Sequence, residues 1–325
     1  PALRLLPPAP RLLSPDFRLA MPFQPSRRQF LKKSGALVVA GSAPLWAPAD
    51  PGPHRLPLLR FGLFTDPHYA DRDAYGTRYY RQSIPKLNEC IDYMNTQNLA
   101  FVIETGDFKD ERPSRVEEET LSFLRDIESV FSRFEGPRYH VLGNHDIDSI
   151  SKAQFQEVVE NTGISRDRTF YGFDTGGCHC IVLDANFRSD GVPYDRGNFT
   201  WTDANISAGQ LEWLRDELWS TRKPILVFCH QLLTDTEKLG VRNAPAVREI
   251  LETRKDRVHA VFHGHKHEGE HQVINGIHYY THKAMVEGDG PGQNAYSVIE
   301  LYRDGTLQIT GYRQADSHTF NTAVS

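Results

Sequence analysis

The sequence is poor in cysteine and has none of the cysteine pairs that form small metal or redox motifs. Only four cysteines occur in 325 residues, at positions Cys90, Cys178, Cys180 and Cys229. No two of them are separated by two residues, which excludes a zinc ribbon and a thioredoxin-like site. They lie in apolar surroundings, so we expect small core residues. The sequence alone leaves open a disulfide that involves Cys178 or Cys180.

Positive charge is also scarce. The net charge is −5, with 37 Lys and Arg against 42 Asp and Glu. Residues 1–49 hold seven basic side chains and one acidic one, which leaves 30 basic and 41 acidic side chains in the rest. The excess of acidic side chains in residues 50–325 argues against a nucleic-acid-binding protein or a nucleic-acid phosphodiesterase, because phosphate contacts require a basic surface.

No apolar run is long enough to span a bilayer. The apolar stretch behind the basic leader, residues 35–49, has 15 residues and contains Pro44 and Pro48. A spanning helix needs about 20 residues. No cysteine lies near the end of this stretch, so we expect neither a membrane anchor nor a lipid anchor. The proportions of hydrophobic (39%) and charged (24%) residues are those of a folded globular protein.

The basic leader has the parts of an export signal. Residues 26–32 read SRRQFLK, and the apolar stretch behind them ends in Ala47-Pro48-Ala49. This segment resembles a twin-arginine signal, which implies that the twin-arginine machinery exports the folded, metal-loaded protein to the periplasm or the medium. We therefore expect residues 1–20 to be an upstream extension, residues 21–49 to be the signal peptide and residues 50–325 to be the mature domain.

Short apolar runs alternate with amphipathic helical patterns in the first half of the mature chain. Strands are predicted at residues 58–64, 100–103 and 139–142. Helices are predicted at residues 80–95, 115–131 and 152–160. This alternation favours parallel strands with helices outside the sheet.

The second half adds further strands and a long loop. Strands at 170–173 and 180–184 are expected to pair around a Thr-Gly-Gly turn, and a loop at 185–205 then leads to a helix whose capping box is Ser207 with Gln210. The remaining elements expected are strands at 224–229 and 258–262, a helix at 246–251, and antiparallel strands within 271–313. We expect one α/β domain, a four-layer αββα sandwich of two mixed β-sheets flanked by helices.

Five of the buried strands end at residues that commonly bind metals. In chain order these residues are Asp66 and His68, then Asp107, then Asn144, His145 and Asp146, then His230, and finally His263, His265 and His267. Because ligands of open α/β sheets bind beyond the carboxyl ends of the strands, we expect these side chains to converge at one edge. Gly106, Gly143 and Gly264 are expected to provide the tight turns that aim the next side chain.

The chemistry of these residue types is that of a two-metal site. Carboxylates, an amide oxygen and imidazoles suit Mn, Fe or Zn. With one bridging carboxylate, seven ligands provide two ions with about four ligands each. Two such ions about 3.5–4 Å apart stabilise the attacking and leaving oxygens of a phosphoryl displacement, and they lower the pKa of a water between them.

The strand-end residues resemble the pattern of the calcineurin-like metallophosphoesterase family: D-x-H, G-D, G-N-H-D/E, H and G-H-x-H, in that order. The resemblance implies a metallophosphoesterase fold. The ligands it implies are Asp66, His68 and His267 for one metal, Asn144, His230 and His265 for the other, and Asp107 as the bridge. It also implies that His145 steadies or protonates the leaving oxygen, and that Asp146 orients this imidazole by accepting its other N–H.

Other side chains near these motifs are candidates for binding substrate or supporting the site, and for each of them a purely structural role is the alternative. We expect His263 to be a core residue rather than a ligand. The remaining candidates are Arg72, Arg78 and Arg81 for substrate phosphate, Tyr194, Phe199 and Trp201 for base stacking, and Asp110 for a hydrogen bond near Asp107.

Within the family, the chain is similar to manganese-dependent ADP-ribose/CDP-alcohol diphosphatase-like proteins. The residues that carry this likeness are Phe61-Gly62, Tyr69-Ala70-Asp71 and RYYR at 78–81; that branch commonly has glutamine in place of His68. The likeness implies a dimetal phosphohydrolase in which a metal-bridging hydroxide attacks a phosphodiester or nucleotide-type pyrophosphate bond of a small substrate. A phosphate-scavenging phosphomonoesterase and a non-catalytic metal-binding module remain alternatives.

Overall fold

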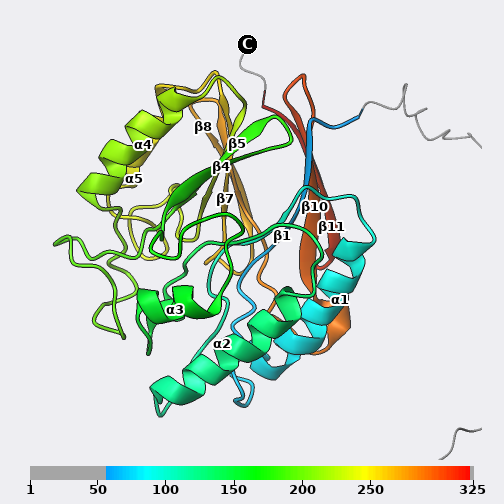
Figure 1. Cartoon of the computed structure of the whole chain (residues 1–325), viewed down its shortest axis with the longest axis vertical. Coiled ribbons are helices and arrows are strands. Elements are labelled where there is room, and N and C mark those ends of the chain that lie inside the picture. The colour runs from blue at the N-terminus through cyan, green and yellow to red at the C-terminus, as the bar shows by residue number, and fades with distance from the viewer. Residues whose placement is uncertain (1–55, 323–325) are drawn as a thin grey trace, which may run out of the picture. The chain divides into compact units, whose positions relative to one another are not determined.

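Two six-stranded mixed β-sheets pack face to face, with helices on both outer faces (Figure 1). This computed structural model describes residues 56–322. The expected upstream extension and signal peptide, residues 1–49, lie outside the described residues. Over the described part of the chain, no helix has both the length and the apolar composition that crossing a bilayer requires.

The first sheet is parallel in one half and antiparallel in the other. Its strands, in spatial order, are β12 (His318–Asn321), β11 (Thr306–Arg313), β10 (Ala295–Leu301), β1 (Leu59–Phe64), β2 (Val102–Glu104) and β3 (Arg138–His140). The pairs β1–β2 and β2–β3 are parallel, whereas β10 runs antiparallel to β1. The carboxyl ends of β1, β2 and β3 therefore share one edge, as the alternating sequence pattern predicts.

The second sheet has four parallel strands between two antiparallel edge strands. Its spatial order is β4 (Tyr171–Thr175), β5 (Cys178–Leu183), β6 (Ile225–Cys229), β7 (Val258–His263), β9 (Ile277–Thr281) and β8 (Glu270–Ile274). The expectation that all strands within 271–313 pair antiparallel is wrong for β9, which pairs parallel with β7. Alternating polarity shows that a segment is a strand, but it does not identify the neighbour of that strand.

Helices cover the outer face of each sheet and complete the expected four layers. The helices are α1 (Ser83–Asn95), α2 (Glu117–Phe131), α3 (Lys152–Val158), α4 (Ala208–Ser220) and α5 (Ala244–Glu252). Apolar residues of α1, α2 and α3 pack on the first sheet, and those of α4 and α5 pack on the second. In Figure 1, α4 and α5 accordingly lie on the opposite side of the sandwich from α1.

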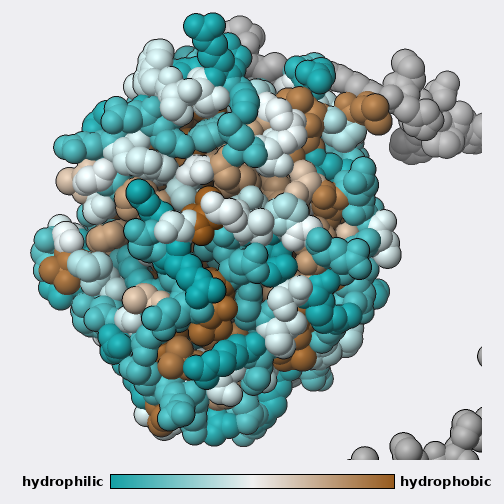
Figure 2. All heavy atoms as spheres, viewed as in Figure 1, coloured by the Kyte–Doolittle hydropathy of each residue, from teal (hydrophilic) through white to brown (hydrophobic). Residues whose placement is uncertain are grey.

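A third apolar core fills the space between the sheets. At its centre, Phe61 of β1 contacts Phe101, Phe228 and Phe262, with ring centroids 4.9, 5.8 and 5.7 Å away. Truncating such a side chain to alanine typically costs about 3–5 kcal/mol. On the outer face seen in Figure 2, hydrophilic side chains predominate and hydrophobic ones form small separate groups.

The cysteines and the helix caps test two local expectations. All four cysteines are free and buried, so the prediction of small core residues is confirmed. Ser207 caps α4 by accepting the N–H of Gln210, but the expected capping box is wrong because the Gln210 side chain instead bonds the backbone of Asp184. A complete capping box occurs at α3, between Ser151 and Gln154.

Candidate metal centre

The seven predicted ligands lie on loops that follow five parallel strands of the two sheets. Those after β1, β2 and β3 come from the first sheet, and those after β6 and β7 come from the second. The seven residues that these loops present are Asp66, His68, Asp107, Asn144, His230, His265 and His267. The sandwich thus brings together side chains that are as many as 201 positions apart in sequence.

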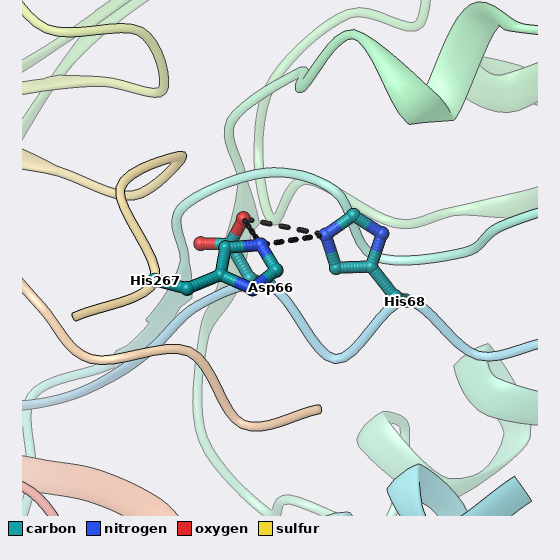
Figure 3. A group of neighbouring side chains, drawn as sticks. All are labelled: Asp66, His68 and His267. Carbon is teal, nitrogen blue, oxygen red and sulfur yellow. Dashed lines mark hydrogen bonds and ion pairs between the residues drawn. The ribbon is translucent and has the colours of Figure 1, made fainter. Parts of the chain in front are cut away.

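Asp66, His68 and His267 form one cluster, here named the first group. The Nε2 atoms of His68 and His267 both lie 3.5 Å from Asp66 Oδ1, and they lie 3.2 Å from each other. In Figure 3 the two imidazoles and the carboxylate point toward one another. All three side chains thus present donor atoms to one small volume.

His230 and His265, together with Asn144, which lines the same cavity as His265, are here named the second group. Asp107 lies between the two groups. Asp107 Oδ2 is 3.1 Å from His230 Nε2 and 3.5 Å from His68 Nε2. Asp107, His230 and His265 also satisfy the distances of a common ligand set. One carboxylate oxygen therefore faces both groups, which is the arrangement expected of a bridging ligand.

The unpaired atoms of the second group fit a cation. Asn144 Oδ1 and His265 Nε2 are buried and have no hydrogen-bond partner among the described residues, and His230 Nε2 has only the Asp107 carboxylate, at 3.1 Å, beside it. Burying a polar atom without a partner costs about 1–3 kcal/mol, so these atoms together require an explanation. A divalent cation bound to oxygen and imidazole ligands provides one.

The opposite nitrogen of three imidazoles is held by an acceptor, which leaves Nε2 for a metal. His68 Nδ1 lies 3.1 Å from Asp110 Oδ2, and His267 Nδ1 lies 2.5 Å from Glu287 Oε1. His230 Nδ1 donates to the carbonyl oxygen of Thr105 at 2.8 Å. Because these oxygens accept hydrogen bonds from Nδ1, the neutral tautomers carry their lone pair on Nε2.

Backbone strain is concentrated at the ligands. Asp66, His68, Asp107 and His265 have φ values of 51°, 46°, 56° and 68°. This left-handed region costs a residue with a side chain about 1–2 kcal/mol. Such strain persists where the surrounding structure imposes it, commonly at functional sites. The four turns therefore place ligands at the expense of stability.

The three glycines serve the site in two different ways. Gly106 has φ +102° and supplies the expected turn. Gly143 and Gly264 do not have positive φ values, so backbone conformation does not require glycine at these two positions. A Cβ at either position would lie 2.2 Å from Asp107 or from Thr65, respectively. Glycine is required there because other ligand loops approach too closely for any side chain.

The charges of the site favour a cation. Burial raises the pKa of Asp107, but the His230 and His145 imidazoles oppose this and hold it well below its usual range. Burial lowers the pKa of His267, but hydrogen bonds to Asp66 and Glu287 raise it to about 9. Protons therefore occupy some ligand positions at neutral pH, and binding of a metal releases them.

The expected contact between His145 and Asp146 is wrong. The Asp146 carboxylate accepts the backbone N–H groups of Asp107, Phe108 and Gly143 at 3.0, 2.9 and 2.8 Å. These bonds tie together the turns that carry Asp107 and Asn144. Asp146 therefore acts on the ligand loops through the backbone rather than on an imidazole.

Two other carboxylates face the His145 imidazole. Its Nδ1 lies 3.5 Å from Asp148 Oδ2 and 3.6 Å from Asp110 Oδ2. The short 3₁₀-helix η2 (His145–Ile147) explains the difference, because residues three apart share a face in a 3₁₀-helix and adjacent residues do not. The sequence pointed to Asp110 only as one alternative, and no motif signalled Asp148 or Glu287.

Some of the remaining candidate residues have structural roles, and others line a cavity at the metal centre. His263 is a core residue, as expected, with Nδ1 2.8 Å from the Cys229 carbonyl oxygen. Arg81 pairs with Asp71 and Asp73 on the surface. Arg72, Arg78 and Trp201 line a cavity of about 650 Å³ together with Asp107, Asn144, His145, His265 and His267. The metal centre therefore borders a cavity large enough for a small substrate.

Comparisons with known proteins agree with this geometry. The family model described as calcineurin-like phosphoesterase matches residues 59–269, which include all seven predicted ligands. A manganese-dependent ADP-ribose/CDP-alcohol diphosphatase from Oryza sativa subsp. japonica is 29% identical over 81% of this chain and 94% of its own length. The Arabidopsis thaliana protein with the same description is 27% identical over 82% and 98%.

The fold has a counterpart among solved structures. A dimetal phosphatase from Danio rerio superposes with a TM-score of 0.69 at 20% sequence identity, covering 82% of this chain and 100% of that one. The family model spans more than half of the chain, and the ligand geometry agrees with a two-metal, metal-dependent phosphoric ester hydrolase. The chain therefore belongs to the calcineurin-like phosphoesterase family.

Proposed function

We propose that the protein hydrolyses a nucleotide-type pyrophosphate or phosphodiester bond in a small substrate. The observation that carries this proposal is the position of Asp107 Oδ2, within 3.5 Å of imidazoles of both groups. A shared carboxylate makes the two groups one centre with room for two cations. The substrate class is supported by the plant relatives, whose descriptions name ADP-ribose and CDP-alcohols.

Both groups would hold divalent cations, and Mn, Fe and Zn all suit the ligands. When bound, such cations withdraw electron density from the phosphoryl oxygens and lower the pKa of water. The protein's own contribution is to fix the ligands. Asp146 ties the loops of Asp107 and Asn144, and the Nδ1 partners of the imidazoles set their orientation.

His145 is proposed to donate a proton to the leaving oxygen. Its side chain is 31% exposed and lines the cavity beside Asp107 and Asn144. Burial lowers the pKa of His145, but Asp110 and Asp107 together raise it well above its ordinary value. These carboxylates therefore favour the protonated imidazole, which is the form that can donate a proton.

Substrate comparison tests the proposal. Protein loaded with Mn, Zn, Fe or Co is assayed against ADP-ribose, a CDP-alcohol, bis-p-nitrophenyl phosphate and p-nitrophenyl phosphate. We expect the pyrophosphates to be hydrolysed with a higher kcat/KM than the monoester. Hydrolysis of the monoester alone would indicate a phosphate-scavenging phosphatase. Fewer than two metals per chain after reconstitution, with no turnover, would indicate a non-catalytic metal-binding module.

We also propose that the protein is exported in folded form by the twin-arginine machinery. The support is the SRRQFLK sequence at residues 26–32 and the apolar stretch that follows it. Residues 21–49 fused to a reporter should direct it to the periplasm. Replacing both arginines, Arg27→Lys with Arg28→Lys, should leave the reporter inside the cell. Export of the double variant would contradict this route.

A further inference from the structure

The loop between β5 and α4 presents the side chain of Trp201 to the metal cavity, whereas Tyr194 and Phe199 pack on each other. Tyr194 and Phe199 stack on each other, with ring centroids 3.8 Å apart and planes 2° from parallel. Trp201 is 45% exposed and lines the cavity. Of Tyr194, Phe199 and Trp201, the three stacking candidates that the sequence analysis named in this loop, Trp201 is thus the one that lines the cavity.

The chain around Trp201 is firmly anchored. Asp203 forms an ion pair with Arg242 at 2.9 Å, and the carbonyl oxygen of Ala204 accepts the backbone N–H of Arg242 at 2.9 Å. On the other side, the carbonyl oxygen of Thr200 accepts the N–H of Asp203 at 2.8 Å. These contacts hold the backbone next to Trp201, which limits the ordering that ligand binding would require of this segment.

The indole lies beside the second group. Its ring centroid is 6.0 Å from that of His265, and the two planes are 62° apart. Leu239 contributes another apolar side chain to the same cavity. The cavity therefore combines an apolar wall, formed by Trp201 and Leu239, with phosphate-binding chemistry at the metal ligands. A ligand that fits both needs a phosphate and a flat apolar face.

We propose that Trp201 is the surface on which the nucleobase of the substrate stacks. This inference rests on the proposed function and specifies which part of the substrate lies next to His265. Every base has a π-face, so stacking on an aromatic side chain tolerates both purines and pyrimidines. A single indole would thus accept an adenine and a cytosine nucleotide without base-specific hydrogen bonds. Trp201 is a specificity-determining residue and not a catalytic one.

Product binding tests this role independently of turnover. The binding of AMP, CMP and ribose 5-phosphate to the metal-loaded protein is measured by titration calorimetry, for the wild type and for Trp201→Ala. We expect the Kd of AMP and CMP to rise about tenfold, equivalent to about 1.4 kcal/mol. The Kd of ribose 5-phosphate should change less than about twofold, because it has no base to stack.

Two further variants control the experiment. Trp201→Phe retains an aromatic face, so AMP affinity should lie between those of the wild type and Trp201→Ala. Trp219, on α4, is 67% exposed, has the Arg254 guanidinium 4.5 Å above its ring and does not line the cavity. Trp219→Ala removes an equally large side chain, and it should leave all three affinities unchanged.

Three outcomes would overturn the inference. They are unchanged AMP affinity in Trp201→Ala, an equal loss for ribose 5-phosphate, and an equal loss in Trp219→Ala. Failure of the proposed function gives a different result, since the wild type would then hydrolyse no pyrophosphate. AMP and CMP binding would still report on Trp201 in that case. Unfolding temperatures of all variants confirm that each one is folded.

Discussion

The two halves of the metal centre share Asp107 but differ in the charge that surrounds them. In the first group, His68 and His267 are backed by the carboxylates of Asp110 and Glu287, at 3.1 and 2.5 Å. In the second group, His230 is backed by a neutral backbone carbonyl, and the oxygen ligand is an amide, Asn144. The first group therefore has more negative charge around its donor atoms.

This difference implies unequal affinity for metal. A carboxylate that accepts the Nδ1 proton makes the imidazole a stronger donor, and such partners typically change metal affinity about 10–100-fold. The pKa values of the imidazoles also differ between the two groups. Burial lowers the pKa of His265 to about 3, aided by nearby His230, whereas His267 reaches about 9. We therefore expect metal titration of the apo-protein to show a tight site and a weaker one.

Replacing the shared carboxylate of Asp107 should weaken metal binding in both groups and cause the largest loss of activity. In the wild type, Asp107 Oδ1 accepts the backbone N–H of His145 at 2.7 Å. The amide oxygen of Asp107→Asn can still accept this hydrogen bond. The bridging negative charge is lost. We expect kcat/KM to fall by about three orders of magnitude, because such stabilisation is worth several kcal/mol. Elemental analysis should show reduced metal in both sites. Full metal content with normal turnover would refute the bridging role.

A variant of His145 tests whether this residue, which lies next to both groups, is a metal ligand or a proton donor. Its position also satisfies the distances of a ligand set with His68 and Asp107. We expect His145→Ala to retain two metals per chain and to lose about 100-fold in kcat, as for loss of a general acid. Loss of one equivalent of metal, measured by elemental analysis, would make His145 a ligand instead.

The Glu287 carboxylate tests the asymmetry directly. Glu287→Gln keeps a side-chain oxygen near His267 Nδ1 but removes the charge. We expect the tight site to weaken about 10-fold, with the weaker site unchanged and kcat nearly normal at saturating metal. Calorimetric titration with Mn separates the two sites. Glu270→Gln, which removes a charge paired with Lys266 outside the cavity lining, is the matched control.

Adding a negative charge to the second group should produce the smallest change, and it should increase metal affinity instead of reducing it. Asn144→Asp makes the weaker site more like the stronger one. We expect its affinity for Mn to rise about fivefold, which corresponds to about 1 kcal/mol of additional Coulomb attraction. Unchanged or reduced affinity in the same titration would show that ligand charge does not explain the difference between the two groups.

Several features of the fold were predictable because local chemistry determines them. Helix α2 was expected at 115–131 and occurs at Glu117–Phe131, since its apolar residues recur at helical spacing. The strands that end at the ligands were also expected within one or two residues of their observed bounds. The parallel pairing of β9 with β7 was not predictable, because it depends on which strand edge is free when the second sheet forms.

The sequence by itself predicted the seven candidate ligands. Each follows a strand at a spacing that the chain's own turns fix, and parallel strands end at a common edge. Only the tertiary structure decided which groups hold these ligands: Asp110, Glu287 and Thr105 behind the imidazoles, and Asp146 between two backbone turns. These contacts join residues far apart in sequence, and they depend on side-chain directions that no local pattern encodes.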